Sequence, residues 1–404
     1  MQIRRNESRG SGRLPSLLAT VMACVLAVGM SVAWTPHFWG SAIVYACVLL
    51  TAGAWIIGTK TFVAIPFSAA LPTALLAVWG WLQLALLGTA APWQTIVHSL
   101  GWTVAVIAFH LSLQTLHSSA ARGRFLSVLA WLCAAFALQA LLQLYSSPDR
   151  ALWLFPVVAV QPVGAFLYKN QFAAMIELAM PIALYWMLFK RERRAEGICV
   201  FLALVAGTVT SGSRAGAALV LAECVVAVLL AWRRKKLSPM FLLGLPAALG
   251  LLVATAYVAG NDLLWSHFQE LHTDIIRQRL LQSTLRMYRS EPWSGFGLGT
   301  WSIIYPPYAT FDVGRLANAA HNDWAEWAAE GGLVFAGSML ALFVRILKPA
   351  LDSVWGLGVI AVMLHSWVDY PLREPSVCVF WFFLAGALCA VRQETSEKKE
   401  AAAH

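Results

Sequence analysis

The sequence has few charged residues, only 12% of its 404 positions, against roughly 25% in soluble globular domains. Hydrophobic residues make up 59%. Runs of about 20 apolar residues, each long enough to cross a bilayer as a helix, recur along the chain. The composition therefore excludes a soluble globular protein and predicts an all-α polytopic membrane protein.

The sequence also lacks the patterns of a disulfide framework and of a metal site. Its 7 cysteines fall within apolar segments, as small core residues do. No His-x-x-x-His, Cys-x-x-Cys or paired-aspartate pattern occurs. We therefore expect neither a metal nor another cofactor.

Twelve membrane spans are predicted, an even number that places both termini on one side. Of the 29 lysines and arginines, 20 cluster at the helix ends that this order brings to the same side as the termini. Because basic loops stay in the cytoplasm, both termini are predicted to be cytoplasmic. The net charge of +9 is then a topology signal, and no nucleic-acid partner is expected. The spans lie at approximately 16–34, 39–58, 68–88, 98–117, 125–145, 172–189, 196–211, 215–232, 239–259, 332–347, 353–369 and 376–391.

One long outer segment, 260–331, separates the ninth and tenth spans. Loops of this length are usually functional or disordered, and its many aromatic residues argue against disorder. Leu264, Phe268, Leu271 and Ile275 recur at helical spacing, which predicts an amphipathic helix. The helix should end near Pro292, because the residue before a proline avoids helical geometry. We expect residues 1–404 to form one domain with this loop inserted.

Arg214 is the strongest single anomaly. It lies in a hairpin of a few residues between the seventh and eighth spans and has no acidic neighbour in sequence. An arginine at membrane depth is costly and by default indicates function, although its long side chain could simply reach the headgroups. Guanidinium groups bind phosphate in a bidentate manner. Arginines gathered at the outer surface would suit a lipid diphosphate.

Two motifs of the long loop each leave two interpretations open. The glycines of residues 295–299 suit either a phosphate cradle or a structural turn, and the turn is favoured because no strand–helix unit surrounds them. His321 precedes a predicted short helix, with Asn322 and Asp323 suited to its cap and first turn. It is either a hydrogen-bonded loop residue or a catalytic one.

The remaining candidates are weaker. Asp323, Glu326 and Glu330 fit surface capping of the short helix at least as well as metal ligation. Asp369 and Arg373 are expected to form a local ion pair. Further polar residues stand at the start of the sixth span or within spans, where they either anchor and join helices or take part in function; these are Lys169, Asn170, Glu177, Glu223 and His110.

The order of these motifs resembles the O-antigen ligase family, which also holds O-antigen polymerases and O-linked oligosaccharyltransferases. The resemblance covers about 165–375. It rests on Tyr168 to Ala173, Ser211 to Gly216, Arg279 through Pro292 to Gly295-Phe296-Gly297-Leu298-Gly299-Thr300, Ala320 to Asp323, Glu330 to Gly332, and His365 to Leu372.

The resemblance implies a bacterial inner-membrane glycosyltransferase of the GT-C type that works at the periplasmic face without a metal. Its donor would be a glycan on undecaprenyl diphosphate. The acceptor would be a sugar hydroxyl of lipid A-core in a ligase, which is favoured. It would be a second lipid-linked repeat unit in an O-antigen or exopolysaccharide polymerase.

The resemblance also implies roles for single residues. His321 would be the essential histidine, and Arg214 and Arg279 the phosphate-binding arginines, with Arg277 as the alternative to Arg279. An inverting displacement would follow, with His321 taking the acceptor proton and the arginines stabilising the leaving diphosphate. Further substrate-binding candidates are Lys169, Asn170, Asn322 and Asp323.

Two other classes of protein fit less well. A secondary transporter of the major facilitator type would carry its long loop inside, after the sixth span, whereas the long loop here is outside and follows the ninth. A non-enzymatic envelope scaffold would leave Arg214, Arg279 and His321 without a role.

Overall fold

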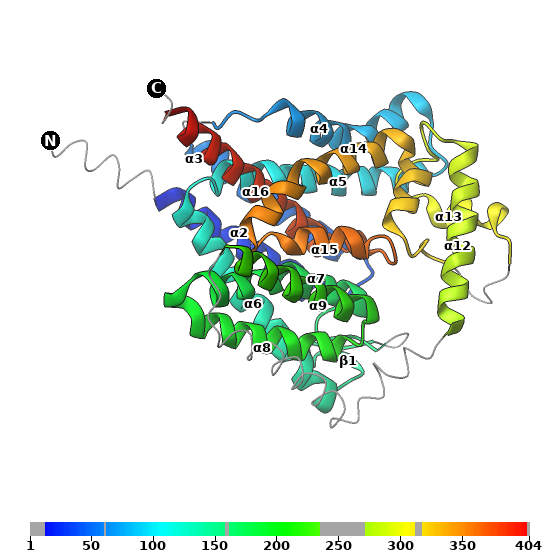
Figure 1. The fold of residues 1–404 in the computed structure, drawn as a ribbon. Coiled ribbons are helices and arrows are strands. Elements are labelled where there is room, and N and C mark those ends of the chain that lie inside the picture. Colours follow the sequence, from blue (N-terminus) through cyan, green and yellow to red (C-terminus); the bar gives the residue numbers. More distant parts are fainter. Residues whose placement is uncertain (1–12, 60–61, 158–160, 235–270, 312–316, 402–404) are drawn as a thin grey trace. The chain divides into compact units, whose positions relative to one another are not determined.

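The computed structural model describes residues 13–59, 62–157, 161–234, 271–311 and 317–401. Nearly all regular structure in them is helical, which confirms the predicted all-α class. Nine helices of this described part are long and apolar enough to cross a membrane. The chain divides into two compact units, described in turn below (Figure 1).

The first unit takes its described residues from 1–40, 118–270 and 350–362. Helix α7 is its centre, because 89% of that apolar helix is buried and it packs against α6, α8 and α9. Gly207 lets α8 approach α6, since a Cβ there would lie 2.8 Å from the Cβ of Ala137. Glu177 of α7 and Glu223 of α9 are both buried in this bundle. The elements are α2 (Arg13–Ser31), α6 (Ser119–Ser146), β1 (Arg150–Ala151), β2 (Phe155–Pro156), α7 (Lys169–Phe189), η2 (Arg191–Arg193), α8 (Arg194–Ser211) and α9 (Arg214–Arg233).

The second unit takes its described residues from 41–117, 271–349 and 363–404. Its core is α5, which packs against α4 and α16. Gly386 makes the α5–α16 approach possible, because a Cβ there would meet the carbonyl oxygen of Phe109. His110 of α5 lies 3.2 Å from the hydroxyl of Thr73 on α4, a contact between helices. The elements are α3 (Phe38–Gly58), α4 (Phe67–Leu82), η1 (Gln83–Leu87), α5 (Pro92–Thr115), α12 (Leu271–Ser290), α13 (Trp301–Tyr308), α14 (Asp323–Ser353), η3 (Pro371–Arg373) and α16 (Pro375–Ala401). Helix α15 (Leu357–His365) has residues in both units.

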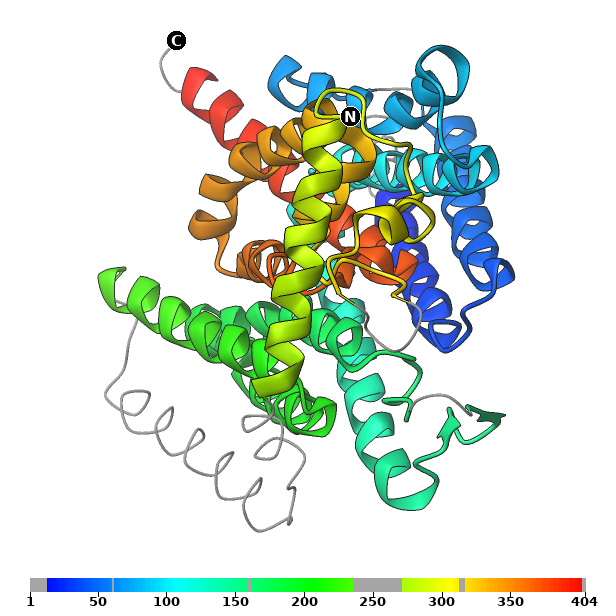
Figure 2. The same cartoon turned by 90° about the vertical axis from the view of Figure 1, so that its right-hand side faces the viewer.

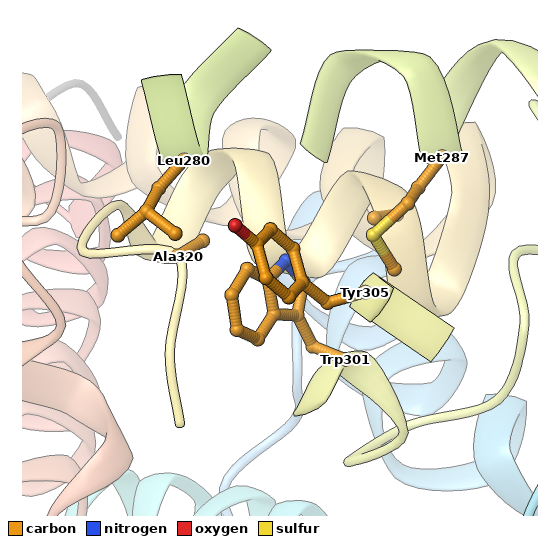
Figure 3. Packing of buried hydrophobic residues seen from close by; sticks show 6 residues of the cluster. Leu280, Met287, Trp301, Tyr305 and Ala320 are labelled. Carbon is orange, nitrogen blue, oxygen red and sulfur yellow. The ribbon is translucent and has the colours of Figure 1, made fainter. Parts of the chain in front are cut away.

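Helix α12 runs across the ends of α5 and α14 in the second unit, with α13 packed against it (Figures 1 and 2). Its inner face contributes Leu280 and Met287 to a buried cluster that also holds the stacked rings of Trp301 and Tyr305 (Figure 3). The helix ends at Ser290, as Pro292 predicted. Its predicted beginning, with Leu264 and Phe268, lies outside the described residues.

Helix α14 joins the predicted short helix to the tenth span through a kink. The kink is at Gly332, whose φ of 65° and ψ of −169° are open to glycine alone. A Cβ at this position would also collide with the carbonyl group of Trp293. The loop before α13 therefore packs directly against the kink.

Two predicted spans need comment. The ninth, 239–259, lies outside the described residues. The eleventh, predicted at 353–369, contains only the nine-residue helix α15, which is too short to cross a bilayer as a helix. The helix ends early because the backbone after His365 makes hydrogen bonds outside the helix. The carbonyls of Ser366 and Asp369 both accept from the amide of Asp323, which holds this segment in turns.

Candidate active site

His321 and Asp369 meet at the start of α14. The Nδ1 atom of His321 lies 3.3 Å from Oδ1 of Asp369. The histidine side chain is 30% exposed and the aspartate only 5%. The ring also packs edge-on against Tyr370. His321 is therefore held on one side and open to solvent on the other.

Arg277 of α12 completes this group. Its NH2 atom donates to Oδ2 of Asp369 at 2.9 Å, while the amide of Tyr370 donates to Oδ1. Burial opposes ionisation of Asp369, but the hydrogen bond from His321 and the charge of Arg277 outweigh it and lower the pKa to about 2. The carboxylate is thus ionised near neutral pH and can only accept, so Nδ1 of His321 carries the proton.

This geometry corrects the expected local ion pair between Asp369 and Arg373. Asp369 is bonded to His321 and Arg277, whereas NH1 of Arg373 lies 3.3 Å from Glu326 Oε1 and 2.6 Å from the carbonyl of Asn318. The expectation rested on the closeness of the two residues in sequence. Here α15 has already ended at His365, and only the short turn η3 follows.

Arg277 and Arg279 point in different directions from α12. Two residues turn a helix by about 200°, so the two side chains flank the buried face on opposite sides. Arg279 is exposed, and its guanidinium lies 5.3 Å from the ring centre of Phe311. The structure thus brings Arg277, and not Arg279, into contact with the His321–Asp369 pair.

Three acidic residues of α14 are buried, which corrects the expected surface capping. Oδ2 of Asp323 accepts from the hydroxyl of Ser366 and the amide of Leu372. Glu326 accepts from the amide of Ala320 at 2.8 Å and from Arg373. Asp323 therefore joins α14 to Ser366 and Leu372, which lie on either side of Asp369 in sequence. Glu326 joins α14 to the residue before His321 and to Arg373.

The third acidic residue, Glu330, fills the glycine-rich turn. Its two carboxylate oxygens accept from the amides of Gly299 and Trp301 at 2.8 and 2.7 Å. Gly297 donates to the backbone carbonyl of Glu330, and its φ of 109° requires glycine. The amides of the turn do bind an acidic group, but that group is the chain's own Glu330 side chain. Residues 295–301 thus form the favoured structural turn.

Asn322 caps α14, as its sequence position predicted. Its Oδ1 accepts from the amide of Ala325, and its Nδ2 donates to the carbonyl of Trp367 at 2.7 Å. Both side-chain groups are therefore used within the protein. Together with Asp323, the residue fixes the backbone next to His321.

A small cavity beside Asp323 lies within the second unit. Its volume is about 70 Å³, room for a few water molecules. Glu326, Glu330 and Arg373 line it together with His98 of α5, whose Nδ1 lies 3.0 Å from the carbonyl of Gln94. Nowhere in the described part of the chain do three or more His, Cys, Asp or Glu side chains gather as a metal site requires.

Arg214, Lys169 and Asn170 belong to the first unit. Arg214 is the first residue of α9, after a hairpin in which Gly212 has a φ of 61° and Ser213 caps the helix by accepting from the amide of Gly216. The predicted hairpin is confirmed, and the side chain of Arg214 is half-buried. Lys169 and Asn170 form the first turn of α7.

The sequence did not reveal that Asp369 forms a hydrogen bond with His321, because the two lie 48 residues apart. The signal that could have raised the question was a carboxylate in a polar stretch, His365 to Arg373, placed on the same predicted outer side as His321.

Residues 198–340 match the family model described as O-antigen ligase. This part of the chain is therefore similar to the O-antigen ligase family. The matched segment contains Arg214, Arg277, Arg279 and His321, and it confirms the resemblance drawn from the motifs. Members of this family are ligases or polymerases that act on lipid-linked glycans, which supports an enzyme. No curated protein matches the chain.

Proposed function

We propose that this chain is a GT-C-type glycosyltransferase of the bacterial inner membrane that transfers a glycan from undecaprenyl diphosphate to an acceptor sugar hydroxyl. The reaction takes place at the periplasmic face, with lipid A-core as the acceptor. The single observation that carries the proposal is the pairing of His321, which lies in the segment matched by the O-antigen ligase model, with Asp369.

His321 acts as the general base. Because Asp369 accepts from Nδ1, the Nε2 atom is the one that takes the proton from the acceptor hydroxyl. The acceptor oxygen then forms a bond to the anomeric carbon as the bond from that carbon to the diphosphate oxygen breaks. One such displacement inverts the anomeric centre and leaves undecaprenyl diphosphate with the bonding electron pair.

Arginines stabilise the departing diphosphate. Arg279 is the candidate from α12, supported by its exposure and by the resemblance of its surrounding motif. The resemblance adds Arg214 as the second phosphate-binding residue. Guanidinium groups can supply the positive charge that a divalent cation supplies in other enzymes, so the transfer needs no metal.

Arg277 and Asp369 are positioning residues. Arg277 keeps Asp369 ionised and fixed, and Asp369 keeps the imidazole in one tautomer and one orientation. Asn322 and Asp323 hold the adjacent backbone, while Lys169 and Asn170 remain candidates for contact with the substrate at the start of α7.

Transfer of a radiolabelled glycan from undecaprenyl diphosphate to lipid A-core by the purified protein tests the proposal. Wild-type protein should transfer label, and His321→Ala should reduce transfer by at least about 100-fold, the usual contribution of a general base. His37→Ala, a change at an exposed histidine elsewhere, is the matched control. Normal turnover by His321→Ala would remove the assignment.

A deletion strain separates ligase from polymerase. Lipopolysaccharide without any ladder bands identifies a ligase. One repeat unit left on the core identifies a polymerase whose acceptor is a second lipid-linked repeat unit. This alternative is supported by the motif from His365 to Arg373, which also resembles family members associated with exopolysaccharide synthesis.

A further inference from the structure

The outward side of α12 carries three arginines along one strip. Arg279, Arg286 and Arg289 are all exposed, and Gln282 lies between them. At about 100° per residue, the spacings of 7 and 3 keep the three arginines within about 80° of arc. We call these four residues the arginine strip. The proposed reaction uses only Arg279 of this set.

Within the part of the chain that the structure describes, the charges of the strip are not neutralised by ion pairs. Among the described residues, no carboxylate forms an ion pair with any of its three arginines. The exposed Glu291, next to the end of α12, instead accepts from the hydroxyl of Ser294. Several unpaired cations on one helix create a positive potential that attracts anions.

The direction of the strip argues against a lipid surface as its partner. Leu280 and Met287 turn the inner side of α12 toward α13 and the start of α14 (Figure 3). By helical spacing, Arg286 and Arg289 lie on the side of α12 away from Leu280 and Met287, and α12 crosses the ends of the helices of the second unit (Figure 2). A ligand in the aqueous phase reaches this side more readily than headgroups of the bilayer.

The length of the strip argues against the donor diphosphate as its only partner. From Arg279 to Arg289 the helix rises about 15 Å, far more than one diphosphate group spans. An extended ligand with several separated negative groups matches this length. Oligosaccharides that carry phosphate or carboxylate groups on their sugars have this character.

We propose that the arginine strip binds an anionic acceptor glycan through such groups and guides it toward His321. The identity of this ligand as the acceptor rests on the proposed function. Binding of this kind strengthens as salt is lowered, because the contacts are exposed and screened by ions. Through Arg286 and Arg289 it lowers the KM for the acceptor and leaves kcat at saturating acceptor unchanged, because these two arginines do not touch the reacting atoms.

The test uses full-length protein in detergent with the double variant Arg286→Gln/Arg289→Gln. The probe is a water-soluble phosphorylated core oligosaccharide, compared with the same oligosaccharide after phosphatase treatment. The double variant should bind the phosphorylated probe about tenfold more weakly, since each exposed charge pair changes a binding constant several-fold. Wild-type protein should bind the dephosphorylated probe equally weakly. Arg150→Gln, at another exposed arginine, should change nothing.

Two results would overturn the proposal. Equal binding of both probes by wild-type and double-variant protein would show that the strip holds no anionic glycan. A double variant that keeps glycan affinity but loses binding to vesicles of phosphatidylcholine and phosphatidylglycerol would assign the strip to the bilayer.

The outcome is distinct from that of the proposed function, because binding is measured without transfer. If wild-type protein transfers no glycan yet binds the phosphorylated probe through the strip, the proposed reaction fails and the strip remains an anionic-glycan site. If transfer succeeds and the double variant shows an unchanged acceptor KM, the reaction stands and the strip proposal fails.

Discussion

Nδ1 of His321 lies 3.3 Å from Oδ1 of Asp369, although 48 residues separate the two in sequence. The second oxygen of the carboxylate is bonded to Arg277, so the imidazole is oriented by a group that is itself fixed. Support of this kind is common around catalytic and metal-binding histidines.

Replacing Asp369 by Asn should therefore lower kcat by about 100-fold, since a misplaced base loses most of its contribution. The KM for the donor should stay nearly constant, and Asp369→Glu should restore part of the rate. Initial rates at varied donor and acceptor concentrations test both points, with Asp149→Asn as the exposed control. A rise in donor KM with unchanged kcat would make Asp369 a binding residue.

Lysine should replace Arg214 or Arg279 poorly. A lysine keeps the charge but loses the planar pair of donors that matches a phosphate. We expect Arg214→Lys and Arg279→Lys each to weaken binding of labelled undecaprenyl diphosphate by about tenfold, close to 1.4 kcal/mol. Arg150→Lys should bind normally. Full affinity in both site variants would leave these arginines as membrane-interface anchors.

Transfer should continue in excess EDTA, and added magnesium or manganese should change the rate little. The physical reason is that arginine supplies the positive charge beside the leaving diphosphate. Activity is measured before and after chelation, with each ion added back separately. Loss of activity that one divalent ion reverses would require a metal to share the role given to Arg214 and Arg279.

Glu330→Gln should destabilise the protein by about 1–3 kcal/mol, because one of the two buried backbone amides that Glu330 accepts from loses its acceptor. The new amide group would present its own N–H atoms to one of the two donors, Gly299 or Trp301. Thermal unfolding in detergent should show a lower Tm, whereas the exposed Glu291→Gln should not. An unchanged Tm for Glu330→Gln would mean that the glycine-rich turn keeps its conformation without the Glu330 carboxyl group.

Glu374 should make stability depend on pH. Burial raises the pKa of this carboxyl from 4.5 to about 7, although the amide and hydroxyl of Ser376 partly oppose the change. The folded state thus favours the neutral form, so stability falls as pH rises from about 4.5 to 7 and stays at the lower level above that.

Glu374→Gln should remove this loss. Its Tm should match wild type near pH 4.5 and exceed it at pH 8. Unfolding curves at a series of pH values test the expectation, and the exposed Glu192→Gln provides the control. A Tm difference that is constant with pH would contradict the assignment to Glu374.

The parts of the fold set by local pattern were predictable from sequence. Apolar runs predicted the long helices, and Pro292 predicted the end of α12 at Ser290. The hairpin before Arg214 also followed from its short length. In each case the residues that determine the feature are neighbours in the chain, so the feature can be predicted without the tertiary structure.

Long-range contacts were not predictable in the same way. The glycine turn was expected to be structural, but nothing local indicated that Glu330, about 30 residues later, would fill it. The acidic residues of α14 looked like surface groups because helical spacing does not tell which loops will cover them. Asp369 was assigned to Arg373 for the same reason: sequence distance favoured the nearer cation.

The backbone of His321 has a φ of 52°, in the left-handed region that residues with a Cβ rarely adopt. Such a conformation costs about 1 kcal/mol or more for most side chains, and glycine escapes most of that cost. A chain selected only for stability would therefore favour glycine at position 321. At position 321, stability favours glycine and the proposed reaction favours histidine. A stabilising substitution selected at this position would therefore lower activity.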